Sequence, residues 1–380
     1  MKYVSLTQVC DFQGGSQPPK DQWIDHEKDG YVRMLQIRDF TQPDKDNVEY
    51  VRVSKTIKTC DEDDILIGRY GASVGKILTG LAGAYNVAII KTIPDTSKLS
   101  KRFLYHYLNS RYFQNFILSV GSRAAQAGFN KDDLCDALIP DLALKEQLDI
   151  VLQLDKISEL IALRKEQLAK LDQLVKARFV EMFGTENDFS RWPCCVVEDV
   201  ADVCVGVVIK PTQYYADKGI PAFRSLNIGE MRVKNCDWVY FTEEGHLKNQ
   251  KSIIRENDVL VIRSGAPGTA CVATAEYAGY NAVDIIIAHP DNQKVNSVFL
   301  AAFTNMPHGM NQIRAKTGGA AQQHFNVGGY KAMHLMLPPL RLQNQFATFV
   351  EQTNKTKLTI QASLDKLEVM KKALMQEYFG

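Results

Sequence analysis

The chain has 380 residues, of which 45% are hydrophobic, so we expect two or more folded domains. A net charge of +1 argues against a uniformly basic nucleic-acid binder but permits local basic patches. The chain contains no apolar run as long as a membrane span, and its eight cysteines form no C-x-x-C pair. These features predict a cytoplasmic protein with reduced thiols, no metal centre and no contact with a membrane.

The first part of the chain, up to about residue 94, is strand-like. Short β-branched runs such as ILIGRY and NVAIIKTI are bounded by Gly, Asp or Pro. Within this part, the stretch GRYGASVGK at Gly68–Lys76 resembles a phosphate-binding loop. A P-loop needs four residues between its glycines and a hydroxyl after its lysine. Gly71 and Gly75 enclose three residues and Ile77 follows Lys76, which disfavours nucleotide binding.

Helical spacing follows the strands. Ser100–Val120 is expected to be helical, and from Leu154 to Met182 apolar residues recur in alternating steps of three and four. A helix of about 30 residues would be a rod of roughly 45 Å, longer than the radius of a small domain, so it needs a packing partner.

The same order of elements is then repeated after about 195 residues, which is far longer than the period of a solenoid. Four runs of the first half have similar counterparts in the second half. RMLQI corresponds to RSLNI, DILIGRYGASVG to DVLVIRSGAPG, AAQAGFN to AAQQHFN, and MFG to YFG. Asn296–Ala315 again has helical spacing, with Pro307 as a possible break, and a second long stripe starts near Ile360. The chain is therefore predicted to be a duplicated mixed α/β domain, each copy ending in a long helix.

Motifs for catalysis are missing. No lysine has an acidic residue two positions before it, as a PD-(D/E)xK nuclease requires, and LPPL at Leu337 lacks the Asn and the ring of an amino-methyltransferase turn. G-x-G and H-E-x-x-H are also absent. We therefore predict that the chain has no catalytic centre of its own.

Two segments suit contact with a phosphate backbone. Lys101–Lys131 and Asn292–Lys331 contain basic residues and no acidic residue, and aromatic residues are interleaved in the first. The alternative is an ordinary amphipathic helix with a basic solvent face.

Specific contacts to bases are predicted at the repeated loops. Glutamine and asparagine side chains in the A-A-Q-x-x-F-N runs can read adenine edges, or they can cap neighbouring loops. Arg69 and Arg263, beside the glycine turns, can reach guanine or phosphate, or form ion pairs with Asp64 and Asp258. The full set of DNA-binding candidates is Arg33, Arg69, Tyr70, Ser73, Lys76, Arg123, Gln126, Asn130, Arg224, Arg263, Ser264, Thr269, Lys316, Gln322, Gln323, His324 and Asn326.

The order and duplication of R-x-L-x-I, D-[IV]-L-[IV], R-x-G-A and A-A-Q-x-x-F-N resemble the specificity subunit of a type I restriction-modification enzyme, over the whole chain. The resemblance implies an α+β fold: two duplicated mixed α/β target recognition domains, separated by two long antiparallel coiled-coil helices with pseudo-twofold symmetry. We expect recognition domains at residues 1–150 and 187–347 and spacer helices at 151–186 and 348–380. Helix packing is assigned to Ile157, Ile161, Leu168, Leu171, Val175, Ile360, Leu364, Leu367 and Leu374.

The resemblance also implies the partners. Each recognition domain would read one part of a split double-stranded DNA target. The helices would dock two methyltransferase subunits, which carry S-adenosylmethionine, while a separate restriction subunit cuts the DNA. This chain would then bind no cofactor. Two alternatives stay open: a methyltransferase or nuclease with an unfamiliar centre, and a coiled-coil adaptor that does not bind DNA.

Overall fold

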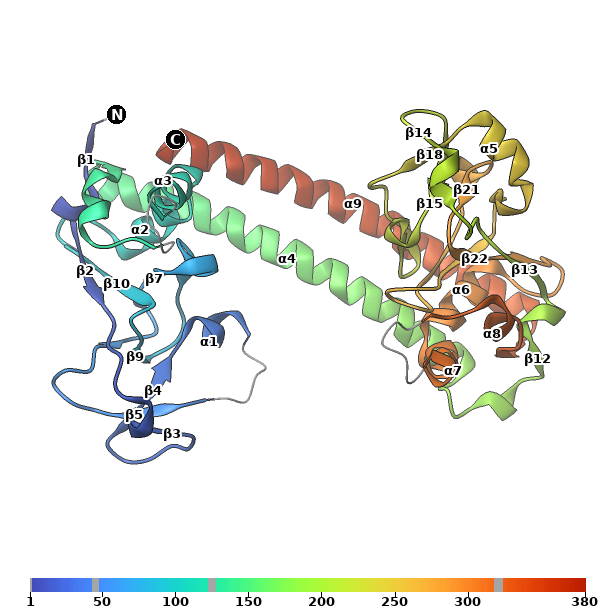
Figure 1. The fold of residues 1–380 in the computed structure, drawn as a ribbon, viewed down its shortest axis with the longest axis horizontal. Helices are drawn as coiled ribbons and strands as arrows, with labels where there is room; N and C mark the ends of the chain where they lie inside the picture. The colour runs from blue at the N-terminus through green and yellow to red at the C-terminus, as the bar shows by residue number, and fades with distance from the viewer. Residues whose placement is uncertain (1, 43–47, 122–127, 318–323) are drawn as a thin grey trace. The chain divides into compact units, whose positions relative to one another are not determined.

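The computed structural model of the chain describes residues 2–42, 48–121, 128–317 and 324–380 (Figure 1). The chain divides into two compact units. Unit 1 comprises Met1–Lys165 and Ala362–Gly380, and unit 2 comprises Glu166–Gln361. Each unit therefore combines one copy of the sequence repeat with segments of two long helices.

Unit 1 contains two main sheets. An antiparallel sheet has the strand order β2 (Cys10–Gly14), β10 (Ile89–Pro94), β7 (Leu66–Gly68) and β8 (Ile77–Leu78). A mixed sheet has the order β3 (Trp23–Ile24), β5 (Tyr50–Arg52), β4 (Tyr31–Leu35), β9 (Gly83–Tyr85) and β6 (Thr59–Cys60), in which β4 and β9 are parallel. The remaining elements are the β1–β11 pair (Tyr3–Ser5, Leu138–Pro140) and helices α1 (Ile37–Thr41), α2 (Lys101–Leu108) and α3 (Arg111–Gly121).

Unit 2 repeats the antiparallel sheet with β13 (Ala201–Val205), β22 (Ile285–Pro290), β19 (Val259–Ile262) and β20 (Ala270–Val272) in the same order. Its second sheet comprises β14 (Tyr215–Ala216), β18 (Val239–Phe241), β15 (Ile220–Phe223) and β21 (Asn281–Ala282). Two further pairs are β12 (Cys194–Val196) with β23 (His334–Met336), and β16 (Ile228–Gly229) with β17 (Arg232–Val233). The duplicated mixed fold predicted from the repeats is confirmed.

The helices of unit 2 follow its sequence signals. They are α5 (Glu243–Lys248), α6 (Ser297–Asn305), α7 (Pro307–Thr317) and α8 (Val327–Lys331). The expected break at Pro307 is real: α6 ends at Asn305 and Pro307 begins α7, where its missing N–H leaves no helical hydrogen bond unmade.

The long helices α4 (Leu144–Phe183) and α9 (Leu340–Phe379) each have 40 residues and contain neither Pro nor Gly. Both begin well before the apolar stripes seen in the sequence. A buried glutamine explains the difference. Gln147 donates to the main-chain oxygens of Lys98 (2.7 Å) and Leu142 (2.9 Å), and Gln343 likewise donates to that of Pro338 (2.8 Å). Polar residues thus fill buried positions in the first turns of both helices.

Within each unit the two long helices run antiparallel. In unit 1 Lys165 pairs with Glu368 at 2.9 Å, and Tyr378 donates to Gln153 at 3.1 Å. In unit 2 Lys357 pairs with Asp172. The nine positions assigned to helix packing differ in burial. Ile157, Val175 and Leu364 are buried, and Ile161, Leu168, Leu171, Ile360, Leu367 and Leu374 are half-buried.

The end of each long helix completes the core of one unit. Phe379, at the end of α9, lies in the core of unit 1 with its ring 5.2 Å from that of Phe103. Phe183, at the end of α4, lies in the core of unit 2 with its ring 4.9 Å from that of Phe299. Unit 1 is therefore built from residues at the two ends of the sequence described here, whereas unit 2 is continuous.

Candidate functional site

Two repeated motifs meet in each unit. Arg69, just after β7, donates from Nε to the main-chain oxygen of Phe129 at 2.7 Å. Arg263, just after β19, makes the same contact with Phe325 at 3.3 Å. Isolated bridges from Tyr70 to Gly128 and from Ser264 to His324 flank these contacts. The arginine of the R-x-G-A motif and the phenylalanine of the A-A-Q-x-x-F-N motif, about 60 residues apart, therefore meet in one loop cluster per unit.

Glycine lets the R-x-G-A turn lie against a helix. Gly75 and Gly268 have φ of 78° and 93°, which disfavours any residue with a side chain. A β-carbon there would lie 2.7 Å from Ile117 of α3 or from Ile313 of α7. The stretch that resembled a phosphate loop is therefore the turn between the paired strands β7 and β8, packed against α3, and not a strand-to-helix phosphate loop.

The two clusters differ in charge. In unit 2 the buried guanidinium of Arg263 pairs with Asp284 at 2.6 Å and donates to Nε2 of His324 at 2.6 Å. Because a guanidinium only donates, His324 accepts at Nε2 and carries its proton on Nδ1, which lies 2.7 Å from the hydroxyl of Ser264. In unit 1 Arg69 makes no ion pair with another described residue and lies 5.1 Å from the ring of Tyr70.

The expected ion pairs with Asp64 and Asp258 are therefore wrong. Asp64 pairs with Lys91, and with Lys101 at 3.2 Å. Asp258 pairs with His289 at 2.5 Å. Both carboxylates also accept from a main-chain N–H three residues earlier, so they brace the turn before the strand.

The other candidates fall into three groups. Tyr70, Lys76 and His324 are exposed beside the clusters, and Ser73, Ser264 and Thr269 are half-buried. Arg33 pairs with Asp39 at 2.9 Å, while Arg224 donates to the main-chain oxygen of Asp237, and neither contacts the arginine of its cluster in the described contacts. Arg123, Gln126, Gln322 and Gln323 lie outside the described residues.

Three further candidates have local structural contacts. The side-chain oxygen of Asn130 accepts from the main-chain N–H of Asp132 at 2.8 Å, and that of Asn326 accepts from Gly329 at 2.7 Å. These are the capping contacts weighed as the alternative to base reading. Lys316 donates to the main-chain oxygen of Gly329 at 2.9 Å, near the end of α8.

The acid-free segments are less basic in the fold than in the sequence. Lys101 pairs with Asp63 at 2.8 Å, Arg102 with Asp155 at 2.8 Å, and Lys131 with Asp11. Carboxylates from distant parts of unit 1 therefore neutralise much of the Lys101–Lys131 segment. Three of the basic residues predicted to suit a phosphate backbone are therefore paired with carboxylates.

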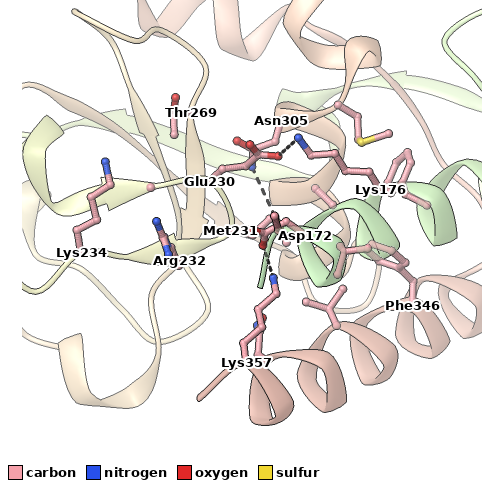
Figure 2. Close-up of a pocket in the computed structure, with 18 residues that line it drawn as sticks. Asp172, Lys176, Glu230, Met231, Arg232, Lys234, Thr269, Asn305, Phe346 and Lys357 are labelled. Atoms are coloured by element: carbon pink, nitrogen blue, oxygen red, sulfur yellow. Dashed lines mark hydrogen bonds and ion pairs between the residues drawn. The ribbon is translucent and has the colours of Figure 1, made fainter. Parts of the chain in front are cut away.

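A cleft lies between the long helices and the sheet domain of unit 2 (Figure 2). It has a volume of about 390 Å³, and its apolar lining includes Phe179, Met231 and Phe346. Ion pairs lie along it: Lys176 with Glu230 at 2.8 Å, and Lys357 with Asp172.

Unit 1 has a cleft of about 450 Å³ at the equivalent place. Its lining residues Asn109, Glu368, Lys372 and Met375 correspond to Asn305, Asp172, Lys176 and Phe179 in unit 2. These clefts were not predicted from the sequence, because their polar residues have the spacing of a solvent-exposed helix face. The repeated asparagine, in LNS and TNM, was the available signal.

Neither a metal site nor a membrane helix is found in the part of the chain that the structure describes. No three His, Cys, Asp or Glu side chains there are placed to hold an ion. The helices there also lack a segment that is both long and apolar enough to span a bilayer.

Comparisons with known proteins agree on one family. The family described as type I restriction modification DNA specificity domain matches residues 1–173 and 197–369. The specificity subunit of the type I restriction enzyme EcoBI from Escherichia coli is 22% identical, over 92% of this chain and 78% of its own length. That of StySPI from Salmonella potsdam is 21% identical, over 88% and 77%.

Two solved structures share the fold. The S subunit of a type I restriction-modification system from M. genitalium has a TM-score of 0.58 and 14% identity, covering 100% of this chain and 96% of that one. A chain from a study of complex assembly and conformational transition of the type I R-M system has a TM-score of 0.58 and 16% identity, covering 100% and 97%. Since the family match takes in both sequence repeats, this chain belongs to the type I restriction modification DNA specificity family.

Proposed function

We propose that this chain is the non-catalytic DNA-reading subunit of a cytoplasmic type I restriction-modification complex. Each unit would read one part of a split double-stranded DNA target. The observation that carries the proposal is the loop cluster found once in each unit, held by Arg69 on Phe129 and by Arg263 on Phe325. Because the cluster occurs once in each unit, each unit can contact one half of a split target.

The side chains exposed around the clusters can contact DNA. Tyr70 is 43% exposed, and Lys76 and His324 are exposed, so an aromatic ring, a cation and an imidazole are available to a groove or a phosphate. The rigid arginine contacts beneath them would hold these side chains in place, which favours selective recognition.

The equivalent clefts support the docking of two copies of one partner. Each cleft has apolar surface, an asparagine (Asn109 or Asn305) and a carboxylate (Glu368 or Asp172) at corresponding positions, and each carboxylate pairs with a lysine of the other long helix. Repeated surfaces bind identical subunits in equivalent ways. We assign these clefts to two methyltransferase subunits, which would carry S-adenosylmethionine, and we expect a restriction subunit to join through them.

The proposal is tested by mapping methylated bases in DNA from cells that contain this chain and its methyltransferase partner. Tyr70→Ala should alter one half of the methylated sequence, and His324→Ala the other half. Leu163→Ala, at an exposed position of α4, is the control and should leave both halves unchanged.

The two alternatives predict different results. Methyl transfer from labelled S-adenosylmethionine by the purified chain alone, at the rate of the complex, would indicate an enzyme. Failure to bind DNA even with the methyltransferase present would indicate a coiled-coil adaptor. Either result contradicts the proposal.

A further inference from the structure

A thiol, an imidazole and a carboxylate lie in line on one face of the β13–β22–β19 sheet of unit 2. Cys204 of β13 has its Sγ 3.7 Å from Nε2 of His289, on β22. Nδ1 of His289 lies 2.5 Å from a carboxylate oxygen of Asp258, just before β19. None of the three belongs to the loop cluster or to the cleft of unit 2.

The carboxylate of this group is buried, whereas the thiol is partly exposed. Asp258 is 2% exposed, and its second carboxylate oxygen accepts from the main-chain N–H of Arg255 at 2.6 Å. Cys204 is partly exposed, and its thiol donates to the main-chain oxygen of Lys251 at 3.3 Å. Asp202 is the cross-strand partner of His289 and is exposed. A small molecule can therefore approach the sulfur, whereas the carboxylate is shielded.

The imidazole is positively charged at neutral pH. The hydrogen bond to Asp258, and then the contact with Cys204, raise the pKa of His289 to about 9. With Nδ1–H donated to the carboxylate, the second proton is on Nε2, which faces the sulfur. An imidazolium next to a sulfur can donate this proton to an oxygen that the sulfur displaces from an oxidant.

Unit 1 has no counterpart of the thiol and the imidazole. Asp64 braces the equivalent turn by accepting from the N–H of Asp61 at 2.9 Å, and lysines neutralise it. The positions equivalent to Cys204 and His289 hold Gln13 and Ile93. In unit 2 Ile287 stands at the position of Lys91, so His289 takes over the neutralisation of the aspartate and brings an imidazole next to the thiol.

We propose that Cys204 is a peroxide-reactive thiol, which hydroperoxides oxidise to a sulfenic acid with the imidazolium of His289 as the proton donor. The thiolate attacks one oxygen of the peroxide, so a sulfur–oxygen bond forms as the oxygen–oxygen bond breaks. Sulfur loses two electrons to the peroxide. The departing hydroxide takes the proton from Nε2 and leaves as water, or as an alcohol from an organic hydroperoxide.

The other cysteines provide references within the chain. Burial raises the pKa of the thiols of Cys10 and Cys271 to about 12 and that of Cys60 to about 11, so these three should be inert. Cys135 and Cys236 are exposed, and neither has an imidazole in its described contacts. They represent ordinary accessible thiols.

The test is a pulse of hydrogen peroxide on the full chain with dimedone present to trap sulfenic acids, followed by peptide mass spectrometry. At pH 7 we expect Cys204 to be labelled at least about threefold faster than Cys135 and Cys236, since only Cys204 has an imidazolium placed to protonate the departing oxygen.

His289→Gln should bring the labelling rate of Cys204 to that of Cys236. His334→Gln, at an exposed histidine of the same unit, is the matched control and should not change the rate. If His289→Gln does not fold, the comparison of cysteines in the unaltered chain decides alone. Equal labelling of Cys204 and Cys236, or a wild-type rate in folded His289→Gln, would overturn the proposal.

Discussion

The Nε of Arg69 donates to the main-chain oxygen of Phe129 at 2.7 Å, although 60 residues separate them. Arg263 and Phe325 repeat this relationship in unit 2. The contact gives the arginine of the R-x-G-A motif a structural role, because it ties the turn after a central strand to the loop that precedes Asn130 or Asn326. The two copies differ in what else the guanidinium binds, and this difference can be measured.

Arg263→Ala should reduce the free energy of unfolding of unit 2 by about 1–3 kcal/mol, because it removes three hydrogen bonds made by a buried guanidinium. Asp284, His324 and Phe325 all lose a hydrogen bond. Arg69→Ala removes a hydrogen bond without leaving a described carboxylate unpaired, and should cost unit 1 about 1 kcal/mol. Hydrogen–deuterium exchange during denaturation resolves the two units. A larger loss for Arg69→Ala would contradict this interpretation of the pair with Asp284.

Lys76→Gln should weaken DNA binding to a similar extent for all sequences and lower the slope of log K against log salt by about one, as the loss of one phosphate contact does. Lys76 is exposed and makes no ion pair with a described residue, so stability should not change. Lys145→Gln, at an exposed position of α4, is the charge-matched control. Binding isotherms at several salt concentrations measure the slope. An equal effect of both changes would place the phosphate contact elsewhere.

Phe379→Ala should destabilise unit 1 by about 3–5 kcal/mol, the usual cost of removing a buried phenylalanine ring. The ring is 1% exposed and packs on Phe103 and Tyr107. Phe183→Ala should have the same effect on unit 2, where Phe183 packs on Phe299 and Phe346. Exchange rates of amides in β10 and β22 report the two units separately. Accelerated exchange in β22 of the Phe379 variant would contradict the assignment of this ring to unit 1.

Asp155 should make unit 1 sensitive to acid. Burial opposes its ionisation, but hydrogen bonds from Arg102 and His106 outweigh burial and lower its pKa. Burial in turn lowers the pKa of His106, so the neutral imidazole donates to Asp155 at pH 7. Because the carboxyl pKa is lower in the folded state, its stabilisation is present above about pH 4 and is lost as the pH falls further.

Asp155→Asn should therefore cost unit 1 about 1 kcal/mol near pH 7, discounted for solvent screening, and flatten the fall in stability below pH 4. Glu351 occupies the equivalent position in unit 2 and pairs only with Lys355 among its described contacts. Lys355 lowers the pKa of Glu351 as well, but this pair is exposed and screened by solvent, so Glu351→Gln should change the pH dependence much less than Asp155→Asn. Urea unfolding at pH 3, 4, 5 and 7 measures the free energy of unfolding of each variant. If the stability of Asp155→Asn falls below pH 4 as steeply as that of the unaltered chain, Asp155 is not the source of the acid sensitivity.

Paired insertions should test whether the long helices set the gap between half-sites. Four residues after Lys170 in α4 and four after Thr359 in α9 add about 6 Å to each helix and nearly preserve its apolar face. The ion pairs of Lys165 with Glu368 and of Lys357 with Asp172 lie on either side of the insertions and can both be kept. Methylation mapping should show a gap longer by one or two base pairs of about 3.4 Å each, with both half-sequences unchanged. An unchanged gap would exclude this role.

The sequence predicts the large features of the fold because repetition and periodicity are local signals. The duplication, the long helices and the break at Pro307 all follow from spacing along the chain. The start of α4 does not, because the buried residue there is Gln147, whose polar groups are satisfied by carbonyls remote in sequence. Only the folded chain shows that those acceptors are present.

The partners in ion pairs could not be predicted from the sequence for a similar reason. Lys101 and Arg102 lie in a segment without acids, yet Asp63 and Asp155 reach them from elsewhere in unit 1. Arg263 is close to Asp258 in sequence but pairs with Asp284, just before the neighbouring strand. Charge read along a sequence therefore says little about charge on a surface when strands from distant segments are neighbours.

The discontinuous make-up of unit 1 bears on the order of events during synthesis. All of unit 2 is translated before Ala362–Gly380, the segment that brings Phe379 into the core of unit 1. On the ribosome, the second repeat can therefore close its core while the first, made earlier, still lacks part of its own. The usual sequence of domain maturation, from the amino end onward, is reversed. In the meantime the apolar surface around Phe103 and Tyr107 stays uncovered, and a nascent chain that stalls in the second repeat is left with an unfinished first one.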